Sequence, residues 1–239
     1  MDPKFRSGVS AVVLAAGTSS RMGQAKQLLR VGETSVLEAV LRNVSATSVD
    51  EIVLVLGASA GLIRDQVPLD SIRVVVNDAY RKGMATSLQA GITHVAPDAR
   101  AAMVVLADQP FVRSETIERL ISEYTNHAAL ITMPVYEGRR GNPVIVDRHL
   151  FPEVAQLSGD VGFRAIFAQH AADIHKVAVD DPGVLVDLDE PADVERALRQ
   201  HAYSGRRTGT EAWRLERSRS FSQRCSHHYP SQWHKNCRL

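Results

Sequence analysis

Residues 9–26 read Val9-Ser10-Ala11-Val12-Val13-Leu14-Ala15-Ala16-Gly17-Thr18-Ser19-Ser20-Arg21-Met22-Gly23-Gln24-Ala25-Lys26. The first six residues are typical of a short strand buried on both faces of a sheet. Small residues and two glycines follow, so the backbone of this loop permits close approach of a ligand. Successive N–H groups in such a turn bind anions, and Arg21 and Lys26 add positive charge. The stretch predicts a phosphate-binding loop; the structural alternative is a tight strand-to-helix connection with exposed basic residues.

The loop differs from two common nucleotide-binding motifs. The dinucleotide fingerprint requires G-x-G-x-x-G, and this loop has only Gly17 and Gly23. A P-loop has Lys directly after its last glycine, whereas Gln24 follows Gly23 here. The residues alone therefore leave both anion binding and a purely structural connection open, and they do not identify a ligand.

The same alternation of strand-like and helix-like segments continues to about residue 200. Short apolar runs rich in Val and Ile recur at 52–56, 72–76, 103–106 and 130–133. Between them, apolar residues follow helical spacing over 36–44 and 117–124. This order predicts an α/β protein with a mostly parallel sheet and helices on both faces. In such sheets ligands bind at the carboxyl ends of the strands.

The composition of the 239 residues excludes several classes of protein. Apolar residues make up 44% and charged residues 23%, values that argue against a collagenous, coiled-coil or wholly disordered chain. No stretch approaches the roughly 20 apolar residues of a spanning helix, and no secretion signal is recognisable. Two cysteines cannot form a disulfide framework. We expect a cytoplasmic protein without membrane association.

The chain divides into a predicted domain, residues 1–200, and a predicted tail, residues 201–239. The tail has eight basic and two acidic residues, a net charge of +6, and lacks Val and Ile. So little aliphatic surface predicts a basic, disordered segment. The domain carries −5, which argues against nucleic acid as a partner.

The pattern Leu14-Ala15-Ala16-Gly17-x-Ser19-x-Arg21-Met22-Gly23-x-x-Lys26 resembles the signature loop of the molybdenum cofactor cytidylyltransferases, which have a MobA-like NTP transferase domain. The resemblance covers about residues 8–200. It implies the three-layer αβα, Rossmann-like fold of the nucleotide-diphospho-sugar transferases, with a mostly parallel mixed sheet. It also implies that this loop binds nucleotide through Leu14, Ala15, Ala16, Gly17, Ser19, Ser20, Arg21, Gly23 and Lys26.

Ala16 bears on the identity of the base. The related guanylyltransferases typically have a second glycine at the position of Ala16. A methyl group here narrows the space beside the base and favours a pyrimidine over a purine.

Further segments fit the same resemblance. Asn77, Gly83 and Ser87 resemble a second nucleotide-binding segment, with ordinary helix capping as the alternative. Asp108 ends an apolar strand and would coordinate Mg²⁺, or Mn²⁺, although a lone Asp there is more often a turn or cap residue. In the closing Asp-x-Asp-x-Pro-x-Asp element, Asp187 or Asp189 would be a second metal ligand, unless Asp189 caps the final helix.

Two segments resemble the acceptor side of the family's site. Gly138–Val144 has Asn142 where His is usual, and this substitution permits binding but puts acid–base chemistry in doubt. Asp160 belongs to a Gly-Asp-x-Gly-x-Arg element; its alternative role is the N-cap of a helix before Phe163. The acceptor's phosphate would be held by Arg139, Arg140 and Arg164.

The implied reaction transfers CMP from CTP to the phosphate of molybdenum-molybdopterin and releases pyrophosphate. Arg21, Lys26 and Asp108 would be the catalytic residues. The alternatives are a GTP-dependent guanylyltransferase, a transferase for another phosphorylated acceptor, and a non-catalytic binder or chaperone of the cofactor. A molybdoenzyme or its chaperone is the expected protein partner.

Overall fold

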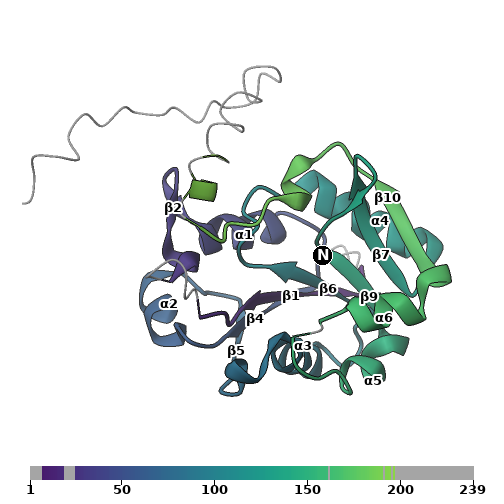
Figure 1. Cartoon of the computed structure of the whole chain (residues 1–239), viewed down its shortest axis with the longest axis horizontal. Helices are drawn as coiled ribbons and strands as arrows, with labels where there is room; N and C mark the ends of the chain where they lie inside the picture. Colours follow the sequence, from purple (N-terminus) through teal and green to yellow (C-terminus); the bar gives the residue numbers. More distant parts are fainter. Residues whose placement is uncertain (1–6, 19–24, 161, 191, 195, 197–239) are drawn as a thin grey trace, which may run out of the picture.

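Eight strands form one sheet in the order β10-β7-β9-β6-β1-β4-β5, with β8 paired to β7 (Figure 1). The computed structural model describes residues 7–18, 25–160, 162–190, 192–194 and 196. The predicted tail, residues 201–239, lies outside the described residues. The strands of the sheet are β1 (Val9–Ala15), β4 (Glu51–Leu56), β5 (Arg73–Val76), β6 (Ala101–Leu106), β7 (Ile131–Tyr136), β8 (Arg139–Arg140), β9 (Val144–Asp147) and β10 (Ile174–Ala178).

The sheet is mostly parallel, as the sequence predicts. β1 pairs in parallel with β4 and β6, and β4 with β5. β9 runs antiparallel to both β6 and β7, so β7 again has the direction of β1, and β10 is parallel to β7. The five apolar runs predicted as strands are confirmed as β1, β4, β5, β6 and β7.

Six α-helices and five 3₁₀ turns connect the strands in the described part of the chain. A small hairpin also joins β2 (Arg30–Val31) to β3 (Thr34–Ser35). The helices are α1 (Val36–Ser45), α2 (Ala60–Gln66), α3 (Met84–Thr93), α4 (Ser114–His127), α5 (Phe151–Val154) and α6 (Arg164–Gln169). The 3₁₀ turns are η1 (Lys26–Leu28), η2 (Tyr80–Lys82), η3 (Arg148–Leu150), η4 (Ala171–Asp173) and η5 (Pro182–Leu185). Over these ranges we find no helix with both the length and the apolar character that a membrane crossing requires.

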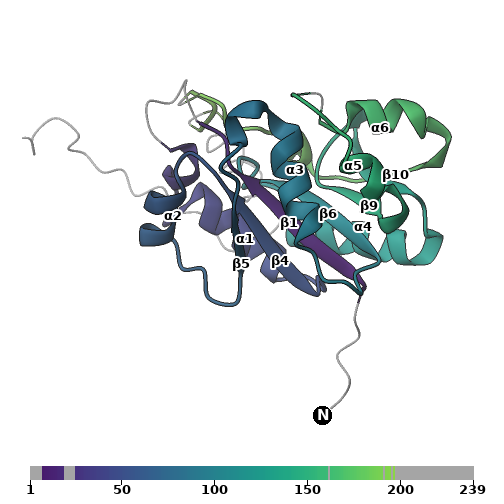
Figure 2. The same cartoon turned by 90° about the horizontal axis from the view of Figure 1, so that it is seen from below.

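Helices cover both faces of the sheet and give three layers (Figures 1 and 2). Alternate residues of β1 point to opposite faces, because side chains alternate along a strand. Val9, Ala11 and Val13 join the core beneath α1, α2 and α4. Val12 joins the core beneath α3, α5 and α6. Burial on both faces explains why this strand is almost entirely apolar.

Two polar arrangements fix the starts of helices on the α1 side. Ser35 accepts from the Glu38 backbone N–H at 3.2 Å, and the Glu38 carboxylate accepts from the Ser35 N–H at 2.6 Å, which forms a capping box for α1. The N-terminus of α4 is held by Asp181, which is buried after β10. Its carboxylate accepts from the Arg113 N–H at 2.9 Å and from the Thr116 hydroxyl at 2.7 Å. The second arrangement fastens the segment after β10 to the middle of the molecule.

The contact between α3 and β1 leaves no room for a side chain at Gly91. A Cβ at Gly91 would lie 2.2 Å from Cγ1 of Val12. Replacing Gly91 with Ala therefore forces α3 away from the sheet, and we expect a loss of about 1–3 kcal/mol in the free energy of unfolding. Gly61 in α2 has nothing within 4 Å of such a Cβ, so Gly61→Ala is the matched control and is expected to gain up to about 1 kcal/mol. Urea unfolding of both variants tests the contact, and equal effects would contradict it.

Candidate active site

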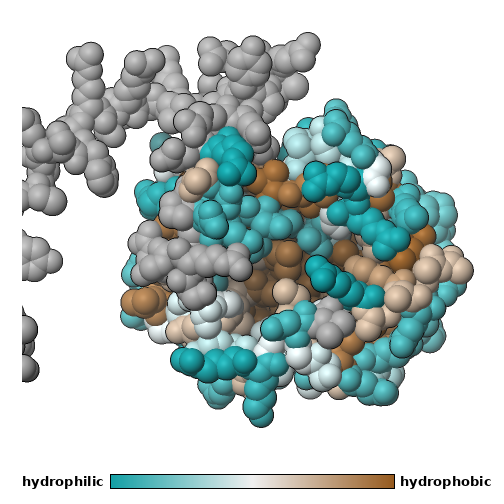
Figure 3. All heavy atoms as spheres, viewed as in Figure 1, coloured by the Kyte–Doolittle hydropathy of each residue, from teal (hydrophilic) through white to brown (hydrophobic). Residues whose placement is uncertain are grey.

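A cleft lies at the carboxyl ends of β1 and β6, the place at which ligands bind in sheets of this kind. Its volume is about 380 Å³. Figure 3 shows apolar residues in the middle of this face of the molecule, between polar ones. The lining residues come from the end of β1, the start of η1, the η2–α3 region, the end of β6 and the loop before α6: Leu14, Ala16, Gly17, Thr18, Lys26, Gln27, Tyr80, Arg81, Gly83, Met84, Ser87, Leu106, Ala107, Asp108 and Asp160.

The wall formed by the first loop is rigidly supported. A Cβ at Gly57 would lie 2.5 Å from the carbonyl oxygen of Ala16, so the segment after β4 packs directly against Ala16. The buried amide of Gln27 donates to the carbonyl of Ala15 at 3.2 Å and ties η1 to the end of β1. Ala16 therefore lines the cleft as a buried residue held against the segment after β4.

Lys26 contacts two acidic segments at the carboxyl ends of the strands. Its Nζ lies 2.5 Å from Oδ2 of Asp108 and 3.0 Å from Oδ1 of Asp189. Burial by itself would lower the pKa of Lys26, but the charges and hydrogen bonds of Asp108 and Asp189 raise it above its ordinary value. Lys26 is therefore an ammonium group throughout the neutral range.

Asp187 is a third carboxylate beside this pair. Its Oδ1 accepts from Nε2 of Gln109 at 2.5 Å, and the Leu188 N–H donates to the carbonyl of Asp108 at 3.0 Å. Burial, and then the negative charge of Asp108, raise the pKa of Asp187, although the hydrogen bond from Gln109 and the charge of Lys26 oppose this shift. Three carboxylates with one ammonium give the edge of the cleft a net negative charge when all are ionised.

This donor set fits a hard divalent cation such as Mg²⁺ or Mn²⁺. Both ions bind carboxylate oxygens together with phosphate oxygens of a substrate. Oδ1 of Asp108 is buried and has no hydrogen-bond partner among the described residues. An unsatisfied carboxylate oxygen in a surplus of negative charge is the environment that a cation would stabilise.

Asn77 holds the second predicted nucleotide-binding segment together. Its buried Nδ2 donates to Thr86 Oγ1 at 2.9 Å and to Ser87 Oγ at 3.0 Å, and its Oδ1 accepts from the Ala79 N–H at 3.0 Å. Ser87 and Gly83 line the cleft, whereas Asn77 does not. Asn77 therefore positions the start of α3 from behind.

Asp160 lies across the N-terminus of α3. Its Oδ1 accepts from the Met84 N–H at 3.0 Å, and the carbonyl of Gly159 accepts from the Ala85 N–H at 3.1 Å. A Cβ at Gly83, which has φ of 109°, would lie 2.5 Å from the Gly159 backbone. Asp160 thus caps α3, whereas α6 begins after Phe163 without a side-chain cap.

The remaining predicted acceptor residues do not line the cleft. Arg139 and Arg140 form β8 and are exposed, paired with Tyr136 and Val135 of β7. Arg164 is exposed at the first position of α6. The backbone N–H of Asn142 donates to the carbonyl of Val184 at 3.0 Å and so supports the segment that carries Asp187. The predicted residues Ser19, Ser20, Arg21 and Gly23 lie outside the described residues.

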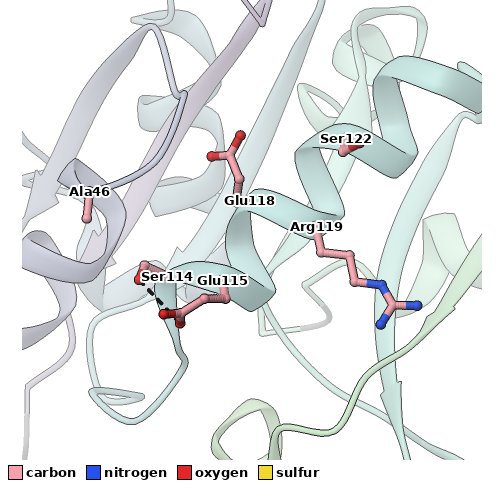
Figure 4. Close-up of a pocket in the computed structure, with 6 residues that line it drawn as sticks. All are labelled: Ala46, Ser114, Glu115, Glu118, Arg119 and Ser122. Carbon is pink, nitrogen blue, oxygen red and sulfur yellow. Dashed lines mark hydrogen bonds between the residues drawn. The ribbon is translucent and has the colours of Figure 1, made fainter. Parts of the chain in front are cut away.

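A second depression, about 440 Å³, lies between α4 and the end of α1 and offers no comparable chemistry (Figure 4). Both carboxylate oxygens of Glu118 already accept from Ser48, one from its N–H at 2.8 Å and the other from its hydroxyl at 2.7 Å. In Figure 4 the guanidinium group of Arg119 points away from Glu118. We therefore place the candidate active site in the cleft beside Asp108.

The sequence did not indicate several residues of the cleft. Gln109 orients Asp187, and its position directly after Asp108 was its only signal. Gln109 itself does not line the cleft. The lining residues that the sequence did not single out come from the end of β1, η1, η2, the start of α3 and the end of β6: Thr18, Gln27, Tyr80, Arg81, Met84, Leu106 and Ala107.

Comparison with known proteins agrees with this geometry. Residues 11–174 match the MobA-like NTP transferase domain. A molybdenum cofactor cytidylyltransferase of Escherichia coli (strain K12) is 25% identical over 188 residues, which cover 78% of this chain and 94% of that protein. A nicotine blue oxidoreductase of Paenarthrobacter nicotinovorans is 30% identical over 199 residues, covering 80% of this chain and 96% of that protein.

Solved structures show the same fold. Rv0371c of Mycobacterium tuberculosis H37Rv, solved in complex with manganese, has 33% identity and a TM-score of 0.71, covering 80% of this chain and 97% of that one. A nucleotidyl transferase of Methanothermobacter thermautotrophicus has 23% identity and a TM-score of 0.70, covering 82% and 98%, and supports the fold alone. The expected nucleotide-diphospho-sugar transferase fold is confirmed. With well over half of its length matched by the family, the chain belongs to the MobA-like NTP transferases, a nucleotidyltransferase family.

Proposed function

We propose that this protein transfers CMP from CTP to the terminal phosphate of molybdenum-molybdopterin and releases pyrophosphate. The observation that carries the proposal is the contact of Lys26 with Asp108 and Asp189, with Asp187 beside them, at the edge of a nucleotide-sized cleft. The similarity to the cytidylyltransferase of Escherichia coli supports this choice of substrates.

The residues of the cleft suit an attack by one phosphate on another. An oxygen of the acceptor's phosphate forms a bond to the α-phosphorus of CTP, and the bond from that phosphorus to pyrophosphate breaks. The attacking oxygen is already ionised, so no general base is required, and the lining residues include no His or Cys in the part of the chain that is described. The barrier is mainly electrostatic, because two anions must approach each other.

Lys26 and the carboxylates have distinct roles in this reaction. Lys26 would stabilise negative charge on the phosphates as it redistributes toward pyrophosphate. Asp108 and Asp187 would hold Mg²⁺, which when bound neutralises phosphate charge and orients the triphosphate. Asp189 would keep Lys26 at the edge of the cleft. Arg21, Ser19, Ser20 and Gly23 stay predictions for triphosphate binding.

The acceptor would extend from the cleft toward the exposed arginines. Asp160 lines the cleft, and Arg139, Arg140, Asn142 and Arg164 are proposed to contact the parts of the acceptor outside it. A molybdoenzyme or its chaperone would receive the product.

The 30% identity to a nicotine blue oxidoreductase supports a second candidate, a redox enzyme. One set of assays separates the candidates. We measure pyrophosphate release with each of the four nucleoside triphosphates, the acceptor and Mg²⁺, and, separately, reduction of nicotine blue by a reduced nicotinamide cofactor. Pyrophosphate release with CTP alone is the expected result. Release with GTP but not with the other triphosphates would indicate a guanylyltransferase. Nucleotide binding without pyrophosphate release would indicate a binding protein. Reduction of the dye without pyrophosphate release would indicate an oxidoreductase.

The charge of Lys26 is the first quantity to test. We expect Lys26→Ala to lower turnover by about 10²–10³-fold, the usual effect of removing one preorganised electrostatic group. Lys176→Ala removes an exposed lysine from β10 and is the matched control. Steady-state pyrophosphate release measures both variants. Near-normal turnover of Lys26→Ala would contradict the proposed role of Lys26.

Asp187 should link stability to pH and to metal. Its raised pKa means that ionising it costs more in the folded than in the unfolded state, so stability falls as pH rises from 3.8 through the raised pKa. Asp187→Asn removes this cost, and we expect a higher melting temperature than wild type at pH 7.5 without metal. Mg²⁺ should raise the melting temperature of the wild type and have less effect on the variant. Equal responses of the two proteins to Mg²⁺ would remove Asp187 from the metal site.

Ala16 should control the choice of base. We expect Ala16→Gly to lower the ratio of kcat/KM for CTP to that for GTP by about tenfold or more, because one methyl group in a binding pocket has effects of this size. Gly17→Ala, at a position where a Cβ meets nothing within 4 Å, serves as a control for added bulk in the same loop. An unchanged ratio in Ala16→Gly would contradict the steric explanation.

A further inference from the structure

A second group of polar side chains lies away from the cleft. Glu123 and His127 are on the last turns of α4, four residues apart, and His175 is on β10. One ligand atom from each of the three residues lies within 4.8 Å of the other two, and they are the only such group of three among the described residues. Nε2 of His175 contacts Oε2 of Glu123 at 2.9 Å. Nδ1 of His127 lies 3.4 Å from the same oxygen and 2.9 Å from the backbone carbonyl oxygen of Glu123, which leaves Nε2 as the other ring nitrogen available to a metal.

The group lies at the opposite end of the sheet from the cleft. The register pairs His175 with Thr132, the second residue of β7. β7 and β10 run in the direction of β1, so this pair is at the amino ends of the strands. The cleft is at the carboxyl ends, after β1 and β6. β10 is also an edge strand, and β7 and β9 lie between it and β6, so the group is separated in space from the charges around Asp108.

Two imidazoles and a carboxylate are a donor set for a transition metal rather than for Mg²⁺. Imidazole suits Zn²⁺, Ni²⁺ and Co²⁺, whereas Mg²⁺ prefers oxygen. Bonds to zinc from these groups are about 2.0–2.2 Å long, so two donors of one ion are at most roughly 4.3 Å apart. The separation of up to 4.8 Å exceeds this limit by about half an ångström, so side-chain rotations that also turn the imidazole rings are needed to place all three donors on one ion.

The surroundings favour a cation at this point. The C-terminal end of α4, where His127 lies, carries the negative end of the helix dipole. Thr132 points to the α4 face of the sheet, as His175 does, because paired residues of neighbouring strands share a face. Its hydroxyl is buried and has no hydrogen-bond partner within the described part of the chain. Such an oxygen can accept the N–H of an imidazole ring whose other nitrogen binds a metal.

We propose that Glu123, His127 and His175 form a binding site for a divalent transition metal such as Zn²⁺, with water at the remaining positions. The ion would join the end of α4 to the edge strand β10 and stabilise this end of the domain. The two imidazole rings are stacked, with centroids 4.2 Å apart and an angle of 21° between planes. Metal–nitrogen bonds lie in the ring plane, so binding turns the rings out of this stack. The inference is independent of the proposed function.

The test uses the full-length protein with excess Mg²⁺, which occupies carboxylate sites that prefer it. We titrate Co²⁺ and follow its visible absorption, and we measure melting with and without Zn²⁺. His175→Ala is the main variant. His149→Ala is the matched control, because His149 also contacts a carboxylate, Asp147 at 2.6 Å, but belongs to no three-donor group in the described chain. Histidines and cysteines of residues 201–239 are present in every variant, so only differences between proteins are compared.

We expect the wild type and His149→Ala each to bind one tightly held Co²⁺ ion that His175→Ala lacks. The affinity of the site for this ion should fall by at least about 10–100-fold in His175→Ala. Losses of this size follow even when only a residue that hydrogen-bonds a metal ligand is removed. Zn²⁺ should raise the melting temperature of the first two proteins only. Glu123→Gln keeps the shape of the side chain and should also weaken binding. This variant keeps the test decisive if His175→Ala fails to fold. Identical titrations of all four proteins would show that the group is only a hydrogen-bonded cluster.

Discussion

The repulsion among Asp108, Asp187 and Asp189 is the constraint on which the candidate active site depends. Like charges close together in a partly buried place are unfavourable unless cations offset them. The described structure offers Lys26, which contacts two of the three carboxylates. One ammonium cannot balance three carboxylates, and burial together with the negative charge of Asp108 raises the pKa of Asp187. The candidate site therefore suits a divalent cation, which would offset the charge of these carboxylates and of a bound triphosphate.

The fold brings these charges together from distant parts of the chain. Asp108 follows β6 in the middle of the sheet, whereas Asp187 and Asp189 follow β10 at its edge. The intervening segment returns across the sheet because buried Asp181 fastens it to the start of α4. Gly141 and Gly183 let it pass close to other backbone, since a Cβ at Gly141 would lie 2.6 Å from the Val184 carbonyl. The candidate metal site is thus assembled by packing of a loop, not by a local motif.

The sequence predicted five strands of the sheet, the edge strand β5 among them, and missed β8, β9 and β10. β1, β4 and β6 are buried on both faces, so their apolar runs are unmistakable. β10 was missed because an edge strand tolerates polar residues, here His175 and Lys176. For the site, Lys26 and Asp108 were each predicted from the sequence, and the structure brings them into contact because each follows a central strand. The paired arginines 139 and 140 suggested phosphate binding, but pairing with β7 places them on β8 outside the cleft lining. Only tertiary packing decides such positions.

The two ends of the sheet differ in the metals that they can select. The carboxyl end presents carboxylates and a lysine around a cleft, and hard oxygen donors there suit an ion that arrives and leaves with a nucleotide. The amino end presents two imidazoles and one carboxylate on a helix end and an edge strand, a set that holds a borderline ion more firmly. The imidazoles disfavour Mg²⁺ at the amino end, whereas abundant Mg²⁺ would occupy the carboxylates at the carboxyl end by availability. A structural ion at β10 would then stabilise the strand that precedes the segment carrying Asp187. Because Asp181 fastens that segment to the start of α4, the ion would support the cleft through the packing of the chain.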